Sequence, residues 1–476
     1  MTALSKVQRP TNAQLSQILA LPVAVAAGLV SAIAGPTAVL LCIGVIVVIP
    51  LFWLSVENLI GLWLVLALAD PVLPRIGGLS FSDLFLIMAL AKLTLQRGKL
   101  PRLPRQVVII LSLAWFAEIV LMTLGHSVTP DNSRFLVTLA GLSAVVCIVW
   151  SSTNFTIWLI WIAVASAVAA CLSIIQYSIY RVSGIVIFPH AQNLFFVRTG
   201  ISNVFKATGL GIDPNFLGMW MVPGVGIGLI GVLRSKRRLL YGSLIVLCVA
   251  GILATASRGA LLSVVIGGAL VTLLETSSPQ RRVNTRILRF VGLLLITAIV
   301  APLLLGVISR AIARYPVTVH TRTEQIPLVL HDAINGNFTG LGYEAQLPQA
   351  ASFGKPFLKS ENVVHNTLLE ALFEAGWIGF LVPLLMILTG LKVALRMIRH
   401  ATLEAAMLAA AFVLLAINLQ TLGAYAFRPF WFLWALLLAV GSTVARRSPA
   451  YIPTSVTAVS HRDSRSLVVE SVNSPK

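Results

Sequence analysis

The chain has 476 residues, of which 58% are hydrophobic and only 11% charged, and its mean hydropathy is +0.92. Because soluble domains carry about 25% charged residues, this composition excludes an ordinary soluble protein and predicts a polytopic membrane protein. The net charge of +19 comes from short basic clusters between apolar blocks, a pattern typical of membrane topology, so we expect no nucleic acid among the partners.

Apolar blocks of about 17 to 25 residues recur along the chain, and this length crosses the roughly 30 Å of hydrocarbon in a bilayer. They predict an all-α fold, a single transmembrane bundle of about 12 to 14 helices. The expected spans are residues 17–34, 37–56, 58–70, 81–96, 106–124, 135–150, 155–179, 215–233, 239–256, 259–274, 287–308, 366–391, 402–423 and 429–446. The cysteines inside these blocks lack the spacing of metal ligands, so we expect no metal site and no external disulfide. They are Cys42, Cys147, Cys171 and Cys248.

Basic clusters between the blocks predict the orientation. If the N-terminus is cytoplasmic, every strong cluster falls on the cytoplasmic side, as the positive-inside rule requires. The clusters are Arg97 to Arg105, Arg234 to Arg238, Arg281 to Arg286, Arg396 with Arg399, and Arg446-Arg447. We therefore expect a multi-pass protein of the cell (inner) membrane, surrounded by lipid, with both termini cytoplasmic.

This span count also divides the chain into regions and gathers the candidate functional residues on the external face. The external segments are residues 180–214, the turn from Ser257 to Gly259, the loop 309–364 and the turn near Tyr425. The expected regions are a cytoplasmic N-terminus at 1–16, a transmembrane bundle at 17–308, the external (periplasmic) loop at 309–364, further transmembrane helices at 365–446 and a disordered cytoplasmic tail at 447–476.

The first candidate motif is His365-Asn366, followed after nine residues by Gly376-Trp-Ile-Gly379. On a continuous helix, eleven residues make three turns plus roughly 20°, so His365 and both glycines share one face. Glycines there let a neighbouring helix approach closely. An interfacial histidine above an ordinary packing seam explains the same residues equally well.

Arg258 is the second candidate, in a turn so short that the arginine stays at the external membrane boundary. An isolated arginine at such a boundary can simply reach out to water. A guanidinium held there could also bind a lipid-linked diphosphate through two parallel hydrogen bonds. We favour the functional interpretation, because ionisable groups in membrane segments are costly.

Lys206 and the stretch Asp213-Pro214-Asn215 precede the eighth span. This stretch has a strong structural explanation, because Asp as N-cap and Pro at the first helical position are common at helix starts.

The external loop carries Arg322 and the stretch Gly340-Leu-Gly342, although charged external loops are usually just solvated. Glu370 and Glu374 follow about one and two turns into the twelfth span, on the side away from His365. There they could pair with a buried base or cap the site.

Together these residues resemble the O-antigen ligase and O-antigen polymerase superfamily, over residues 80 to 440 or so. His365 to Gly379 matches the family signature of His-Asn, nine residues and Gly-x-x-Gly after a long external loop. Further elements are similar: Ser257-Arg258-Gly259 to Ser-Arg-Gly, Asp213-Pro-Asn215 to Pro-Asn, Arg322 with Gly340-x-Gly342 to the loop's Arg and Gly-x-Gly, and Phe81-Ser-Asp83 to the polar start of an early span. One departure is Lys206, which stands where the family often has an arginine and which binds phosphate as a point charge, not as a fork.

The resemblance implies a C-type membrane glycosyltransferase that moves a glycan from a polyprenyl-diphosphate carrier to an acceptor hydroxyl outside the cytoplasm, without a metal or other cofactor. The acceptor would be a glycan, lipid or protein, and ligase and polymerase stay open as alternatives. The catalytic residues would be His365, Arg258 and Arg322, and the substrate-binding residues Lys206, Asp213, Asn215, Asn366 and Glu374.

Two other classes of function are compatible with a polytopic chain. A transporter or flippase would favour broken spans in matching halves and charged groups at the midplane, and neither pattern is evident here. A membrane scaffold without catalysis is the third interpretation.

Overall fold

The structure is a computed structural model of the full chain. It describes residues 53–70, 80–97, 101–123, 130–151, 154–187, 196–199, 202–210, 213–276, 326–327, 329–331, 333–335, 338–340, 366–422 and 427–447. The expected spans 17–34 and 287–308, most of span 37–56, most of the loop 309–364 and nearly all of the tail lie outside these residues.

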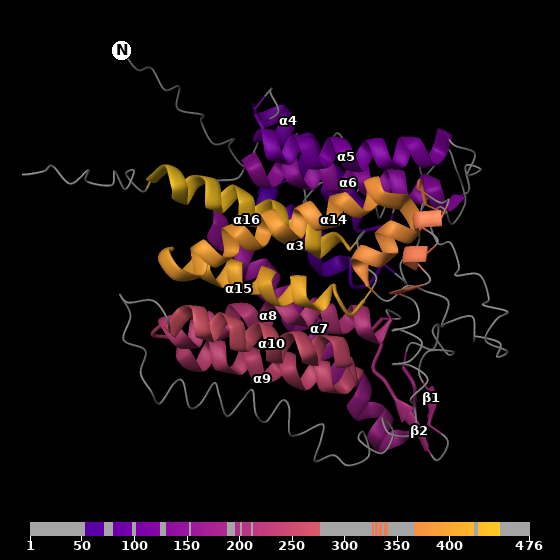
Figure 1. Ribbon diagram of the computed structural model, residues 1–476. Helices are drawn as coiled ribbons and strands as arrows, with labels where there is room; N and C mark the ends of the chain where they lie inside the picture. Colours follow the sequence, from indigo (N-terminus) through magenta and orange to yellow (C-terminus); the bar gives the residue numbers. More distant parts are fainter. Residues whose placement is uncertain are drawn as a thin grey trace, which may run out of the picture.

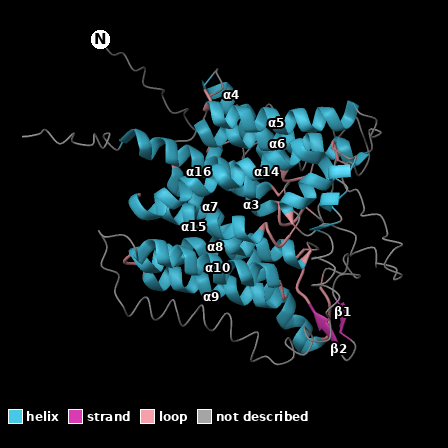
Figure 2. Cartoon of the chain, viewed as in Figure 1, coloured by secondary structure: helices cyan, strands magenta, loops and turns pink. Residues whose placement is uncertain are grey.

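Eleven α-helices make up most of the described chain, which confirms the predicted all-α fold (Figures 1 and 2). They are α3 (Val56–Leu66), α4 (Asp83–Arg97), α5 (Arg105–Thr123), α6 (Pro130–Ser151), α7 (Phe155–Ser183), α8 (Pro214–Arg234), α9 (Arg238–Thr255), α10 (Arg258–Thr276), α14 (Thr367–His400), α15 (Leu403–Asn418) and α16 (Arg428–Arg447). Each lies on an expected span, with ends that differ by up to five residues, except that α14 continues nine residues beyond the expected end at 391.

Five helices of the described chain are long and apolar enough to cross a membrane, namely α7, α8, α9, α10 and α14. Three shorter apolar helical stretches join them: α3, α15 and residues Leu139–Ser151 of α6. The helices run side by side across the bundle in Figure 1, as expected for a polytopic membrane protein.

Helix α8 lies at the centre of this bundle and is buried over nearly its whole length. Glycines allow its neighbours to come close on three sides. A Cβ atom added at Gly224, Gly226 or Gly228 would come within 2.6 Å of atoms of α7, α15 and α9, respectively. Such small-residue contacts are the usual means by which membrane helices pack, since lipid provides no hydrophobic drive between them.

A small antiparallel hairpin, which the sequence did not predict, stands at one end of the bundle (Figure 2). It consists of β1 (Phe196–Thr199) and β2 (Ser202–Phe205). The ring of Phe205 stacks on Tyr180 of α7, with ring centroids 4.1 Å apart. The hairpin is thereby anchored to the last turns of α7 and leads directly into Lys206.

Two of the basic clusters, 234–238 and 396–399, lie together at the other end of the bundle. Arg234, at the end of α8, pairs with the buried Glu275 at the end of α10. Its Nη1 atom also donates a hydrogen bond to the Ala401 carbonyl after α14, at 3.2 Å. The clusters 234–238 and 396–399 therefore share one end, as the orientation argument requires. The side of the membrane that this end faces stays a prediction.

Candidate functional site

The described parts of the predicted motifs meet at the end of the bundle that carries the hairpin. Helix α8 begins there, and the carboxylate of Asp213 accepts a hydrogen bond from the Asn215 backbone N–H at 2.7 Å. Pro214 occupies the first helical position. The structural explanation of this stretch is confirmed, and a contact of Asp213 or Asn215 with substrate stays a prediction.

The loop that carries Lys206 is fixed by two neighbours. The Ala207 N–H donates to the Ala254 carbonyl at the end of α9, at 3.0 Å. The Oε1 atom of Gln176 accepts from the N–H groups of Thr208 and Gly209, at 2.7 and 2.8 Å. Gln176 is 1% exposed, so a buried side chain of α7 sets the path of the loop.

The turn between α9 and α10 holds Arg258 at the surface. Ala256 has a φ of 52°, in the left-handed region, and reverses the chain. Ser257 begins α10, because its carbonyl accepts from the Leu261 N–H at 3.1 Å. Arg258 is exposed, and its guanidinium makes no hydrogen bond or ion pair with any other residue of the described chain. A cation is therefore presented at the N-terminus of a helix.

Two close contacts connect this turn to α8 and α15. A Cβ atom on Gly218, in the second turn of α8, would lie 2.8 Å from the Cβ atom of Ser257. Gly259 lies directly against Thr421, just beyond α15, with no room for a side chain between them. The starts of α8 and α10 and the end of α15 are thus packed together.

The same segment after α15 holds the start of α14. The side-chain oxygen of Asn366 caps α14 by accepting from the Leu368 and Leu369 N–H groups, at 2.9 and 3.1 Å. Its Nδ2 atom donates to the Gln420 carbonyl at 3.0 Å. The Thr367 N–H donates to the Leu419 carbonyl, also at 3.0 Å. The residue next to His365 is therefore held in place from two sides.

The expectation that His365, Gly376 and Gly379 share one face of a continuous helix is wrong. Gly376 has φ 64° and ψ −163°, which interrupts α14 within its first three turns. The helical rotation that related the three residues assumed helical geometry at every position between them.

The neighbour that packs against Gly376 is the middle of the long loop, at residues 338–340, and not a helix. The Trp377 N–H donates to the Phe338 carbonyl at 3.2 Å. Gly340 has a φ of 84°, and a Cβ atom there would lie 2.5 Å from the Gly376 nitrogen. The Trp377 indole N–H donates to the Ala333 carbonyl, also at 3.2 Å. The first glycine of the Gly-x-Gly stretch and the first of the Gly-x-x-Gly signature are therefore direct neighbours.

Glu374 is 7% exposed and lies immediately before this interruption, where its own backbone carbonyl contacts Gly340. Its predicted place two turns into the helix is correct, and a substrate contact stays a prediction. His365 and Arg322 lie outside the described residues. No three His, Cys, Asp or Glu side chains of the described part are grouped as metal ligands would be.

A second polar cluster, which was not predicted from the sequence, lies around Arg428. Arg428, the first residue of α16, forms ion pairs with Asp70 and Asp83 at 3.0 and 2.9 Å. Beside it, Phe427 packs on Trp220 of α8, with ring centroids 5.5 Å apart. The cluster thus joins the start of α16 to Asp70, to the start of α4 and to α8. Its only signal in the sequence was the polar stretch Phe81-Ser-Asp83.

The fold and the candidate site define the class: a polytopic α-helical membrane protein with an exposed arginine, Arg258, where several helix ends meet. Residues 243–384 match the family model described as O-Antigen ligase. The matched segment begins within α9, contains Arg258 and extends past Gly379, so it confirms the resemblance that the sequence predicted. None of the curated proteins compared with the chain matches it. The family match supports a membrane glycosyltransferase of the ligase or polymerase type.

Proposed function

We propose that the protein transfers a glycan from a polyprenyl-diphosphate carrier to an acceptor hydroxyl at the external face of the cell membrane, as an O-antigen-type ligase or polymerase. The observation that carries the proposal is Arg258: an exposed cation, unpaired within the described chain, inside the family-matched segment and at the junction of the other motifs.

The proposed reaction is a displacement at the anomeric carbon of the donor. A bond forms from the acceptor oxygen to that carbon, and the bond from the carbon to the diphosphate oxygen breaks. The acceptor proton goes to a base, and the diphosphate leaves with the electron pair of the broken bond. Negative charge grows on the diphosphate, so cations positioned beside it lower the barrier by several kcal/mol.

Arg258 suits the role of diphosphate ligand for two physical reasons. Its guanidinium offers a planar pair of donors that matches two phosphate oxygens. It also stands at the start of α10, where backbone N–H groups and the helix dipole favour an anion. Lys206 and Arg322 would add positive charge, with Lys206 acting as a point charge.

His365 is the proposed base that takes the acceptor proton. It precedes Asn366, whose two-sided anchoring fixes the start of α14. An imidazole titrates near neutral pH, which suits proton transfer. Contacts with the substrates are also proposed for four polar residues: Asp213, Asn215, Asn366 and Glu374.

Replacement of Arg258 tests the proposal. Arg258→Ala should reduce transfer from a lipid-linked donor by about 10²- to 10³-fold, the usual effect of removing one charge-stabilising donor. Arg258→Lys should recover little, because a single ammonium cannot form the fork. The Ala variant should unfold no earlier than wild type, since the cation at a helix N-terminus opposes the dipole.

Arg181 provides the matched control. It is an exposed arginine at the same end of the bundle, in the last turn of α7, where a cation complements the helix dipole. Arg181→Ala should leave transfer close to wild type. Near-normal transfer by purified Arg258→Ala would refute the proposed role. In a deletion strain, unattached lipid-linked polymer would indicate a ligase, and single repeat units a polymerase.

A further inference from the structure

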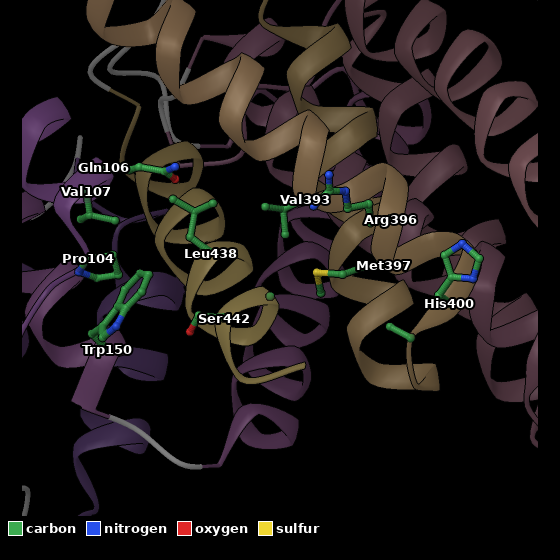
Figure 3. A pocket seen from close by; sticks show the side chains of 12 residues that line it. Pro104, Gln106, Val107, Trp150, Val393, Arg396, Met397, His400, Leu438 and Ser442 are labelled. Carbon is green, nitrogen blue, oxygen red and sulfur yellow. The ribbon is translucent and has the colours of Figure 1, made fainter. Parts of the chain in front are cut away.

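A pocket of about 540 Å³ opens at the basic end of the bundle, away from the candidate site (Figure 3). It lies between the last turns of α14 and α16, with the start of α5 and the end of α6 completing its wall. The lining residues are Pro104, Gln106, Val107, Trp150, Val393, Arg396, Met397, His400, Ala401, Leu438, Gly441 and Ser442. Its volume is in the range of small-molecule sites.

Four hydrogen-bond donors of the lining have no partner in the described chain. They are the Arg396 guanidinium, the His400 ring, the Gln106 amide and the Trp150 indole N–H. Among the lining residues there is no carboxylate. Arg102 and Arg105 beside Pro104 add further positive charge nearby. The polar part of the pocket therefore favours an anion.

The rest of the lining is apolar. Val107, Val393, Met397 and Leu438 form a surface suited to hydrocarbon. Trp150 carries both characters, an apolar ring and a polar N–H, which is why tryptophan concentrates at the level of lipid headgroups. A ligand that satisfies both parts needs an anionic head and an apolar chain.

We propose that this pocket binds an anionic phospholipid, with its phosphate against Arg396 and His400 and an acyl chain along Val393 and Leu438. Basic pockets between transmembrane helices are known to recognise anionic lipid headgroups. The site is distinct from the candidate transfer site, because Asn366 lies at the opposite end of the 34-residue helix α14. The proposal does not depend on the proposed function.

The test is native mass spectrometry of the full-length, delipidated protein with added phosphatidylglycerol, phosphatidylcholine or inorganic phosphate. Wild type should retain one phosphatidylglycerol in preference to phosphatidylcholine. Arg396→Ala should weaken this retention about fivefold, the effect of one charge near a lipid surface. Ser442→Phe should weaken it by filling the pocket without a change of charge.

Arg399→Ala is the matched control, because Arg399 is exposed on the same helix, three residues on, and does not line the pocket. It should bind like wild type. Equal losses in Arg396→Ala and Arg399→Ala would overturn the proposal and indicate general charge attraction. Equal retention of both lipids, or displacement of phosphatidylglycerol by millimolar inorganic phosphate, would also overturn it. Melting temperatures verify that each variant is folded, and Arg396→Gln replaces Arg396→Ala if that variant is not.

Discussion

At the scale of single residues, the site combines side chains that cap helices with an arginine that has no capping role. Asp213, Ser257 and Asn366 each begin a helix, and their polar atoms are engaged by backbone groups. Arg258 has no such engagement within the described chain. A capping role is readable from sequence because it is local, as at Asp213-Pro214. Gln176 was missed because its bonds reach residues 32 and 33 positions away.

Substitution of His365 tests its proposed role as the general base. His365→Ala should lower turnover by about 10²- to 10⁴-fold, the usual contribution of a general base. Donor binding should survive, because Arg258 and Arg322 would still hold the diphosphate. Steady-state assay of the purified variant with lipid-linked donor, together with a donor-binding measurement, checks both expectations.

The control for this prediction is again Arg181→Ala, a change at an exposed residue at the same end of the bundle that has no proposed part in the reaction. It should leave turnover close to wild type. Turnover of His365→Ala within a few-fold of wild type would show that the histidine only anchors the helix.

At the scale of elements, the contact between Gly340 and Gly376 joins the long loop to α14. Both glycines have positive φ, and each lies too close to the other's backbone to accept a side chain. Gly340→Ala and Gly376→Ala should each destabilise the protein by at least 1 kcal/mol, since strain and a clash act together. Their effects should not add in the double variant, because the first change already opens the contact.

Thermal unfolding of the purified variants measures these effects, and Gly242→Ala provides the control. Gly242 is in α9, and the nearest atom that a Cβ atom there would meet is 4.0 Å away. Helix propensity should make that variant as stable as wild type or slightly more stable. Equal melting temperatures for Gly376→Ala and Gly242→Ala would show that the contact between Gly340 and Gly376 does not stabilise the protein.

The helices could be predicted from the sequence, whereas the break in α14 and the hairpin that connects α7 to α8 could not. Apolar length located each described helix, because crossing a bilayer imposes a simple constraint on composition. The break at Gly376 was missed, since a Gly-x-x-Gly pattern fits a packing seam on an unbroken helix equally well. The hairpin at 196–205 was missed because its anchor, the stack of Phe205 on Tyr180, joins residues far apart in sequence.

At the scale of the whole molecule, the bundle has two chemically different ends. The Arg234–Glu275 pair and the clusters 234–238 and 396–399 lie at one end, and Arg258, Asn366 and the hairpin lie at the other. Moving a cluster such as 236–238 across a membrane is opposed during insertion, whereas a single arginine such as Arg258 is tolerated at the far boundary. This asymmetry predicts that the basic end is cytoplasmic and the candidate site external.

Cysteine labelling of intact cells tests that orientation, in a background that lacks the four native cysteines, of which Cys171 is exposed. Asn335 and Lys236 are both exposed, on the loop fragment beside α14 and after α8, respectively. A membrane-impermeant maleimide should modify Asn335→Cys in intact cells and Lys236→Cys only after lysis. Equal reaction of both introduced cysteines after lysis would show that neither is shielded by burial in the protein. The reverse pattern in intact cells would place Arg258 and Asn366 in the cytoplasm, where external transfer from a lipid-linked donor is impossible, and would refute the topology and the proposed function together.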